Sequence, residues 1–372
     1  MCLTKCFSNR FGRNCYFGKK LELTYARAIF CIVIVIVHAM TGFLNDHHIS
    51  HVQKMGYSFL QIVLLFATPC FIILSETLLG MRYSTYTPKN FFIKRVKYIL
   101  VPYLFFGFFV TFKLFIDEST NSSFWEIFFG IVIQGKFFGW FVLVIFQFYI
   151  LHVLFYKILS KANPIYLLLS SFLISFAHSF LMYYNPTYLD LWDKYYPFFN
   201  RTIIFYWLFY FVVGFYFGKY YETIISFFKN KIYWFLLIWF LSIFYMAFNF
   251  FYLNVYLNES NRFDLLLFSS VSFVFIVYFA KALSKFNLNF ILLISEISFF
   301  IYLSHQIIVD YISKSLAVFV TQPILFFVLT TIFTLGFCIG LAIILSFIPY
   351  VRIVVGRNTL QPMIINNYQL QK

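Results

Sequence analysis

The chain has 372 residues, of which 62% are hydrophobic and only 11% are charged. Soluble domains carry roughly 25% charged residues, so a water-soluble fold of this length would lack the charges to cover its surface. The net charge of +15 comes from 28 Lys and Arg against 13 Asp and Glu. These basic residues occupy short gaps between apolar runs and form no stripe on a soluble element. We therefore exclude nucleic-acid binding and expect an all-α protein in a lipid bilayer.

Ten apolar runs of spanning length predict a bundle of about ten transmembrane helices, because each has the roughly 20 residues that a hydrocarbon core of about 30 Å requires. They fall near residues 24–44, 57–79, 98–116, 138–156, 165–183, 202–219, 232–252, 265–283, 290–312 and 323–347. The piece 124–135 before the fourth run is expected to be either re-entrant or interfacial. The first run is too long for a signal-peptide core and is expected to be an uncleaved helix.

The distribution of basic residues predicts the orientation. Alternate segments, beginning with the N-terminus and ending with the tail, hold 20 of the 28 Lys and Arg residues, and the opposite gaps hold 7. Loops rich in Lys and Arg stay in the cytoplasm, so both termini are predicted to be cytoplasmic. The expected organisation is a basic N-terminal segment (1–23), one transmembrane domain (24–347) and a C-terminal tail (348–372).

Neither cysteines nor loop histidines predict a metal site. Three cysteines lie inside apolar runs and behave as small hydrophobes, and the other three, near the N-terminus, lack metal-ligand spacing. His47 and His51 in the first outer loop have the i, i+4 spacing that two ligands of a shared metal can have. Because no further acidic or Cys ligand beyond the adjacent Asp46 is evident, solvated loop histidines are favoured and no metal is expected.

Arg27 and His38 break the first apolar run and lie on one helix face. Eleven residues at 100° each bring His38 within 20° of the direction of Arg27, roughly 16 Å further along the axis. An anionic cytosolic donor held by Arg27 would thus reach towards a titratable imidazole deep in the bundle. The alternative is that Arg27 extends to the lipid headgroups and His38 makes a structural hydrogen bond between helices.

Further ionisable or polar residues interrupt other runs. Glu76 in the second run lies at a depth similar to that of Arg27, so a structural ion pair between them competes with ligand binding by Arg27. Ser298, Tyr302 and His305 in the ninth run form one polar stripe at i, i+4 and i+7. His305 is expected at the depth of His38, so that both line one cavity; the alternative is a stripe satisfied inside the bundle. Isolated His152 and His178 are expected to be structural.

These residues resemble the acyltransferase-3 superfamily, ten-helix membrane enzymes that move acyl groups onto glycans. The resemblance rests on Arg-x10-His in the first run and on further matches, in order, over nearly the whole chain: residues 69–75 (PCFIILS), Lys94-Arg95 ahead of Pro102, residues 139–141 (GWF) and residues 298–305 (SFFIYLSH). In two places the chain departs from the superfamily pattern. Tyr98 stands where a second Arg is frequent, and Gln306 stands where Pro commonly follows the histidine.

Within the superfamily, three segments are most similar to the intercellular adhesion protein C group, which is linked to poly-N-acetylglucosamine of biofilms. They are residues 21–29 (LELTYARAI), 67–75 (ATPCFIILS) and 95–103 (RVKYILVPY). Proteins of that group are described both as exporters and as O-acylating enzymes. The resemblance implies a multi-pass protein of a bacterial plasma membrane, with a cell-surface polysaccharide as acceptor and a membrane polysaccharide synthase as a partner.

The favoured function is transfer of an acetyl or succinyl group from a cytosolic acyl-CoA-type donor, with no bound cofactor. Arg27, Arg95 and Lys97 are then expected to bind the donor, and His38 to act as general base on a sugar hydroxyl. Ser298, Tyr302 and His305 are expected to position the acceptor or the oxyanion. The alternative is export of poly-β-1,6-N-acetyl-D-glucosamine across the cell membrane, and a third interpretation is a non-catalytic assembly subunit. The absence of P-loop, Rossmann, nucleophile-elbow and HExxH motifs argues against ATP-driven transport and metalloprotease activity.

Overall fold

The computed structural model describes residues 20–117, 122–286, 288–348 and 351–355, and every regular element within them is helical. Most of the predicted N-terminal segment, and the C-terminal tail from residue 356, lie outside the described residues. The α-helices of the first half are α1 (Leu21–Asp46), α2 (His51–Leu64), α3 (Ala67–Tyr83), α4 (Phe91–Arg95), α5 (Val101–Ile116), α6 (Phe124–Phe128), α7 (Phe141–Lys161) and α8 (Pro164–Tyr184). Those of the second half are α9 (Pro186–Tyr195), α10 (Leu208–Lys219), α11 (Tyr221–Asn230), α12 (Ile232–Phe251), α13 (Leu265–Leu283), α14 (Asn289–Glu296), α15 (Ser298–Ala317), α16 (Pro323–Ser346) and α17 (Arg352–Val355).

Short 3₁₀ and π segments join several of these helices. The π segments are η1 (Val96–Leu100) and η2 (Phe129–Ile133), and the 3₁₀ segments are η3 (Phe138–Trp140), η4 (Asn200–Thr202), η5 (Ile204–Tyr206) and η6 (Ser284–Phe286).

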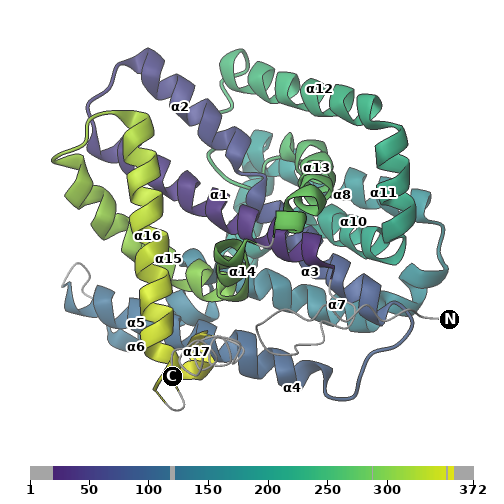
Figure 1. The fold of residues 1–372 in the computed structure, drawn as a ribbon, viewed down its shortest axis with the longest axis horizontal. Coiled ribbons are helices and arrows are strands. Elements are labelled where there is room, and N and C mark those ends of the chain that lie inside the picture. The colour runs from purple at the N-terminus through teal and green to yellow at the C-terminus, as the bar shows by residue number, and fades with distance from the viewer. Residues whose placement is uncertain (1–19, 118–121, 287, 349–350, 356–372) are drawn as a thin grey trace.

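Helix α1 runs through the middle of the bundle. Figure 1 shows α15 and α16 on one side of it and α3, α10 and α13 on the other, and α1 packs against α3, α13, α15 and α16. The helices towards the outside of the bundle expose apolar faces, such as that of α12 with Phe240 and Phe244. Exposed apolar surface on this scale is what a lipid-facing bundle requires, so the prediction of an all-α membrane protein is confirmed.

Eight helical segments are long and apolar enough to cross a membrane, and α14 with α15 makes a ninth if that bent pair is one span. The pair corresponds to the predicted run 290–312 but bends by 81° at Ile297. At the bend the Ser298 hydroxyl donates to the Ser295 carbonyl, 2.9 Å away. Broken helices are tolerated at membrane depth where they are buried in protein or line a cavity.

The predicted run 202–219 differs from expectation. It consists of two 3₁₀ turns followed by α10, whose 12 residues extend only about 18 Å and are too few to cross the hydrocarbon core alone. Nine of these residues are buried, so protein rather than lipid surrounds this helix. The piece 124–135 is likewise a short apolar helix, Phe124–Ile133.

Close packing of α10 on α3 depends on two glycines four residues apart. A Cβ on Gly214 would lie 2.6 Å from the Ile73 carbonyl oxygen, and one on Gly218 would lie 2.2 Å from the Thr77 oxygen. Small residues at this spacing let membrane helices approach closely. This contact matters for the site because α3 contributes one wall of the central cavity.

Candidate active site

A cavity of about 1470 Å³ lies inside the bundle, and we call it the central cavity. One face of α1 forms one of its walls. Lining residues recur along that face from Leu23 through Arg27 and His38 to Thr41, a length of about 27 Å. The cavity therefore follows α1 through most of a bilayer thickness. The prediction that Arg27 and His38 share one face is confirmed.

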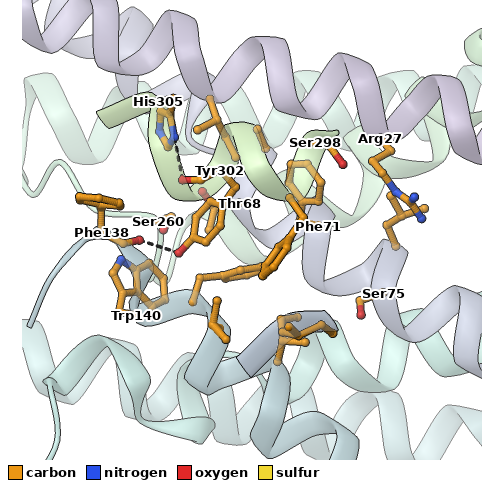
Figure 2. A pocket seen from close by; sticks show the side chains of 18 of the residues that line it. Arg27, Thr68, Phe71, Ser75, Phe138, Trp140, Ser260, Ser298, Tyr302 and His305 are labelled. Carbon is orange, nitrogen blue, oxygen red and sulfur yellow. Dashed lines mark hydrogen bonds between the residues drawn. The ribbon is translucent and has the colours of Figure 1, made fainter. Parts of the chain in front are cut away.

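The cavity has two chemically different ends. Figure 2 shows Arg27 and Ser75 on one side of it and His305 and Phe138 on the other. The first, which we call the basic end, is where α1 begins and where α3 ends. The second, which we call the far end, lies beside His38 and Thr41 of α1. The predicted cytoplasmic orientation of the basic end remains a prediction.

Five cationic side chains line the basic end, accompanied by the carboxyl group of Glu296: Lys20, Arg27, Arg82, Lys94 and Arg95. They come from α1, from the end of α3 and from α4, segments that lie far apart in the sequence. An excess of cations on one cavity wall suits a ligand with several negative charges, such as phosphates.

Arg95 is held there by aromatic side chains. Its guanidinium lies 3.8 Å from the centre of the Phe91 ring and 5.4 Å from that of Tyr149. Its Nη1 also donates to the Phe91 carbonyl, 3.3 Å away. These contacts fix the orientation of the planar group, which a lysine would not reproduce. Lys97 was also predicted to bind the donor, but it does not lie with Arg95 in the cavity. It is exposed on η1 and is absent from the described residues that line the cavity.

Two histidines meet near the far end. The ring centres of His38 and His305 are 4.9 Å apart, and both rings line the central cavity. The prediction that the two histidines line one cavity is thus confirmed, although their chemical roles stay predictions. His305 is only 1% exposed, whereas His38 is half-buried and faces the open space.

The tautomer of His305 follows from its hydrogen bonds. Its Nδ1 lies 2.9 Å from the Ile301 oxygen and 2.8 Å from the Tyr302 oxygen. A carbonyl can only accept, so Nδ1 carries the proton and a neutral ring leaves Nε2 as a bare acceptor. That Nε2 is buried and has no hydrogen-bond partner among the described residues. Neither ring nitrogen of His38 bonds to another described residue. The site therefore presents imidazole nitrogens able to accept a proton or a hydrogen bond.

Aromatic residues form the wall beside these rings. The Tyr302 hydroxyl donates to the Phe138 carbonyl, 2.5 Å away (Figure 2), and so fixes η3 against α15. Trp140 lines the cavity and stacks on Trp207 behind it, with ring centres 5.5 Å apart. Ser298 also lines the cavity. The whole predicted stripe of α15 thus faces this space.

Glu76 lies elsewhere. It is buried behind the cavity wall, with Oε1 2.5 Å from Nδ1 of His152, whose Nε2–H donates to the Tyr83 carbonyl 3.2 Å away. The ion pair predicted between Glu76 and Arg27 stays a prediction. What the structure gives Glu76 is a histidine partner, consistent with the structural role expected for His152. Both residues stand out in apolar runs, but a pair that joins α3 to α7 could not be read from the sequence.

Other predicted features have structural explanations. His178 hydrogen-bonds the Tyr188 hydroxyl through Nδ1, at 2.9 Å. His47 donates from Nε2 to the Val320 carbonyl, 3.0 Å away, and His51 is exposed at the start of α2. The described residues contain no group of three or more His, Cys, Asp or Glu side chains able to hold a metal ion.

Comparison with known proteins decides the family. A family model described as an acyltransferase domain matches residues 20–343. The chain belongs to the acyltransferase-3 family. Two curated relatives of this acyltransferase-3 protein are named probable poly-beta-1,6-N-acetyl-D-glucosamine export proteins. The one from Staphylococcus aureus (strain MSSA476) is 34% identical over 355 residues, 93% of this chain and 98% of the relative. The one from Staphylococcus epidermidis is 34% identical over 346 residues, 91% of this chain and 95% of the relative. No solved structure matches the chain.

These findings bear out the resemblance noted from the sequence. Together with the apolar helices, they identify a multi-pass bacterial membrane protein with an acyltransferase domain. The names of the relatives link them to a polysaccharide and leave catalysis by this chain to be argued from its site.

Proposed function

We propose that this protein transfers an acyl group from a phosphorylated thioester donor of the acyl-CoA type to a hydroxyl of a cell-surface polysaccharide. The pair of His38 and His305 carries this proposal, because it puts basic nitrogens inside a cavity that also has a strongly cationic end. Arg27 and Arg95 would bind the phosphates of the donor at the basic end. The thioester would then extend along α1 towards His38.

In the proposed reaction His38 is the general base. It removes the proton from the sugar hydroxyl as the oxygen attacks the thioester carbonyl. The tetrahedral intermediate collapses, the carbon–sulfur bond breaks, and the leaving thiolate takes the proton back from the imidazolium. The products are an O-acyl sugar and a free thiol. We assign this role to His38 because its ring is open to the cavity, whereas His305 is buried and Nε2 is its only free acceptor.

Ser298 and Tyr302 take supporting roles in this proposal. Tyr302 holds η3 and its aromatic neighbours in place through the Phe138 carbonyl. The Ser298 hydroxyl is engaged with the Ser295 carbonyl. It thereby stabilises the bend between α14 and α15, the helix that carries His305.

The test is acyl transfer by the purified protein in lipid nanodiscs, with labelled acyl-CoA and a synthetic β-1,6-linked N-acetylglucosamine oligosaccharide. Ester-linked acyl groups are quantified by mass spectrometry. We expect His38→Ala to reduce the rate about 10²- to 10⁴-fold. His178→Ala is the matched control, because His178 is also a histidine of a long apolar helix but lies away from the cavity lining. Full transfer by His38→Ala would overturn the mechanism.

Export of the polysaccharide is the second candidate. The length of the central cavity along α1 favours it, as do the names of the relatives. The two functions separate in cells that lack the wild-type protein. Polymer that reaches the surface without ester groups supports the enzyme, whereas polymer trapped inside, and released by His38→Ala as well as by wild type, supports export. A membrane polysaccharide synthase would supply the polymer in either case.

A further inference from the structure

The segment between α12 and α13, residues 252–264, lies against the far end of the central cavity. Three consecutive residues of this segment, Asn258, Glu259 and Ser260, line the cavity. They form a continuous polar edge on this space, whose other walls include the aromatic residues Phe138 and Trp140. We call residues 252–264 the α12–α13 loop.

The base of this loop is rigid. Arg262 is 2% exposed and makes a two-point contact with Asp264, from Nε to Oδ1 at 2.8 Å and from Nη2 to Oδ2 at 2.6 Å. Its Nη1 donates to the carbonyls of Val255 and Leu257, at 3.0 and 2.7 Å. Asn249 at the end of α12 donates to the same Asp264 carboxylate, at 3.0 Å. A buried charge pair with this many hydrogen bonds helps to hold the polar edge in one geometry.

A chain of hydrogen bonds connects the polar edge to the helix that carries His38. Asn258 donates from Nδ2 to Gln61 Oε1, 2.6 Å away. Gln61 in turn donates from Nε2 to the Thr41 hydroxyl at 2.6 Å and to the Val37 carbonyl at 2.9 Å. Thr41 lies three residues beyond His38 on the same face of α1, about 4.5 Å along the axis. The polar edge is thus close to the proposed general base.

A second connection crosses the mouth of the far end. Arg201 donates from Nη2 to Glu259 Oε1, 2.5 Å away, and the Arg201 carbonyl accepts from Trp207 Nε1 at 2.8 Å. The two charged side chains are 31% and 26% exposed, so a ligand can reach both of them. Such a partly exposed pair is weak enough to exchange its hydrogen bonds with an incoming polar group.

The charge of this end differs from that of the basic end. One carboxylate, Glu259, is paired with Arg201 there and Lys136 also lines the cavity, whereas five cations and Glu296 line the opposite end. Amide, carboxylate and guanidinium groups are planar and can bond to neighbouring hydroxyls or to an N-acetyl group. Trp140 and Phe138 line the same space and offer rings to the apolar face of a sugar. This combination suits a nearly neutral, polyhydroxylated ligand.

We propose that Asn258, Glu259 and Arg201, with Gln61 behind them, form the glycan-binding subsite at the far end of the cavity. The sugar replaces the Arg201–Glu259 contact with its own hydroxyls and presents one hydroxyl to His38. This inference rests on the proposed acyl transfer for the role of the bound sugar. The binding site itself does not depend on that reaction.

The experiment measures binding of a β-1,6-linked N-acetylglucosamine oligosaccharide and of acyl-CoA to the full-length protein in nanodiscs by calorimetry. Glu259→Gln and Asn258→Ala are compared with Tyr256→Phe, a change in the same loop at a residue that does not line the cavity. We expect each of the first two changes to lower oligosaccharide affinity at least tenfold. Acyl-CoA affinity should stay within twofold of wild type, and Tyr256→Phe should bind both ligands normally.

Unchanged oligosaccharide affinity in Glu259→Gln and Asn258→Ala would overturn the subsite. A parallel loss of acyl-CoA affinity would also overturn it, because the changes would then act on the whole cavity. Since Asn258 also ties the loop to α2, Glu259→Gln is the decisive variant if Asn258→Ala unfolds at a lower temperature. Failure of the proposed function gives a different result: wild type binds the oligosaccharide, the variants do not, and no acyl group is transferred.

Discussion

The buried contact of His152 with Glu76 joins α7 to α3, and replacing His152 by alanine isolates a carboxyl group that is 1% exposed. Oε2 of Glu76 has no hydrogen-bond partner among the described residues, so the lost imidazole is the group that satisfies this carboxyl. Removing one member of a buried pair costs about 3–5 kcal/mol. The Tyr83 carbonyl loses its donor at the same time.

The same substitution reaches the basic end of the cavity. The Phe91 ring lies nearly parallel to the His152 ring, with centres 6.3 Å apart. The Arg95 guanidinium packs on the same Phe91 ring. Removing the His152 ring leaves an empty space beside Phe91, so the Phe91 ring and the Arg95 guanidinium packed on it can shift. We therefore expect the KM for the acyl donor to rise about tenfold, which corresponds to about 1.4 kcal/mol of lost binding, while kcat changes little.

The assay for stability is unfolding in mixed detergent micelles, with His178→Ala as control. Both substitutions remove a buried imidazole of the same volume, but the partner of His178 is the neutral Tyr188 hydroxyl. Losing a neutral hydrogen bond costs about 1 kcal/mol. His152→Ala should therefore lower the free energy of unfolding by about 2–4 kcal/mol more than the control, and adding Glu76→Gln should recover part of the loss. Equal losses in the two variants would refute this account of the pair.

Two further substitutions test packing and donor binding. Gly218→Leu should lower the free energy of unfolding by about 1–3 kcal/mol or more in the same micelle assay, because a Cβ there lies 2.2 Å from a backbone oxygen of α3. The control Gly336→Leu on α16, where a Cβ meets nothing within 4 Å, should be nearly neutral. Similar losses of stability in both variants would contradict the packing argument. Arg95→Lys should weaken acyl-CoA binding about tenfold in calorimetry, because lysine keeps the charge but loses the planar stacking. Lys97→Ala should leave that affinity within about twofold, and a larger effect of Lys97→Ala would restore the donor role predicted for it.

Hydropathy and helix periodicity in the sequence determined the class of protein and the face shared by Arg27 and His38. Both are local properties, since the bilayer sets the length of an apolar run and the 3.6-residue turn sets which side chains align. The ninth run also yielded its polar stripe, which lines the cavity as expected. The same reasoning wrongly predicted that the run at 202–219 spans the membrane as one helix, because a helix buried in protein and a lipid-spanning helix are equally apolar.

Contacts between segments distant in sequence were decided by the tertiary structure alone. Two pairs of glycines have the same spacing, in α10 and in α16, and only the first packs against another backbone. Glu76 finds its partner 76 residues away in His152, and Asn258 reaches Gln61 across 197 residues. Such pairings depend on how the helices are arranged around α1, and no local pattern encodes that arrangement. The cavity owes its cationic end to the same arrangement, because α1, α3 and α4 must meet before their basic residues form one wall.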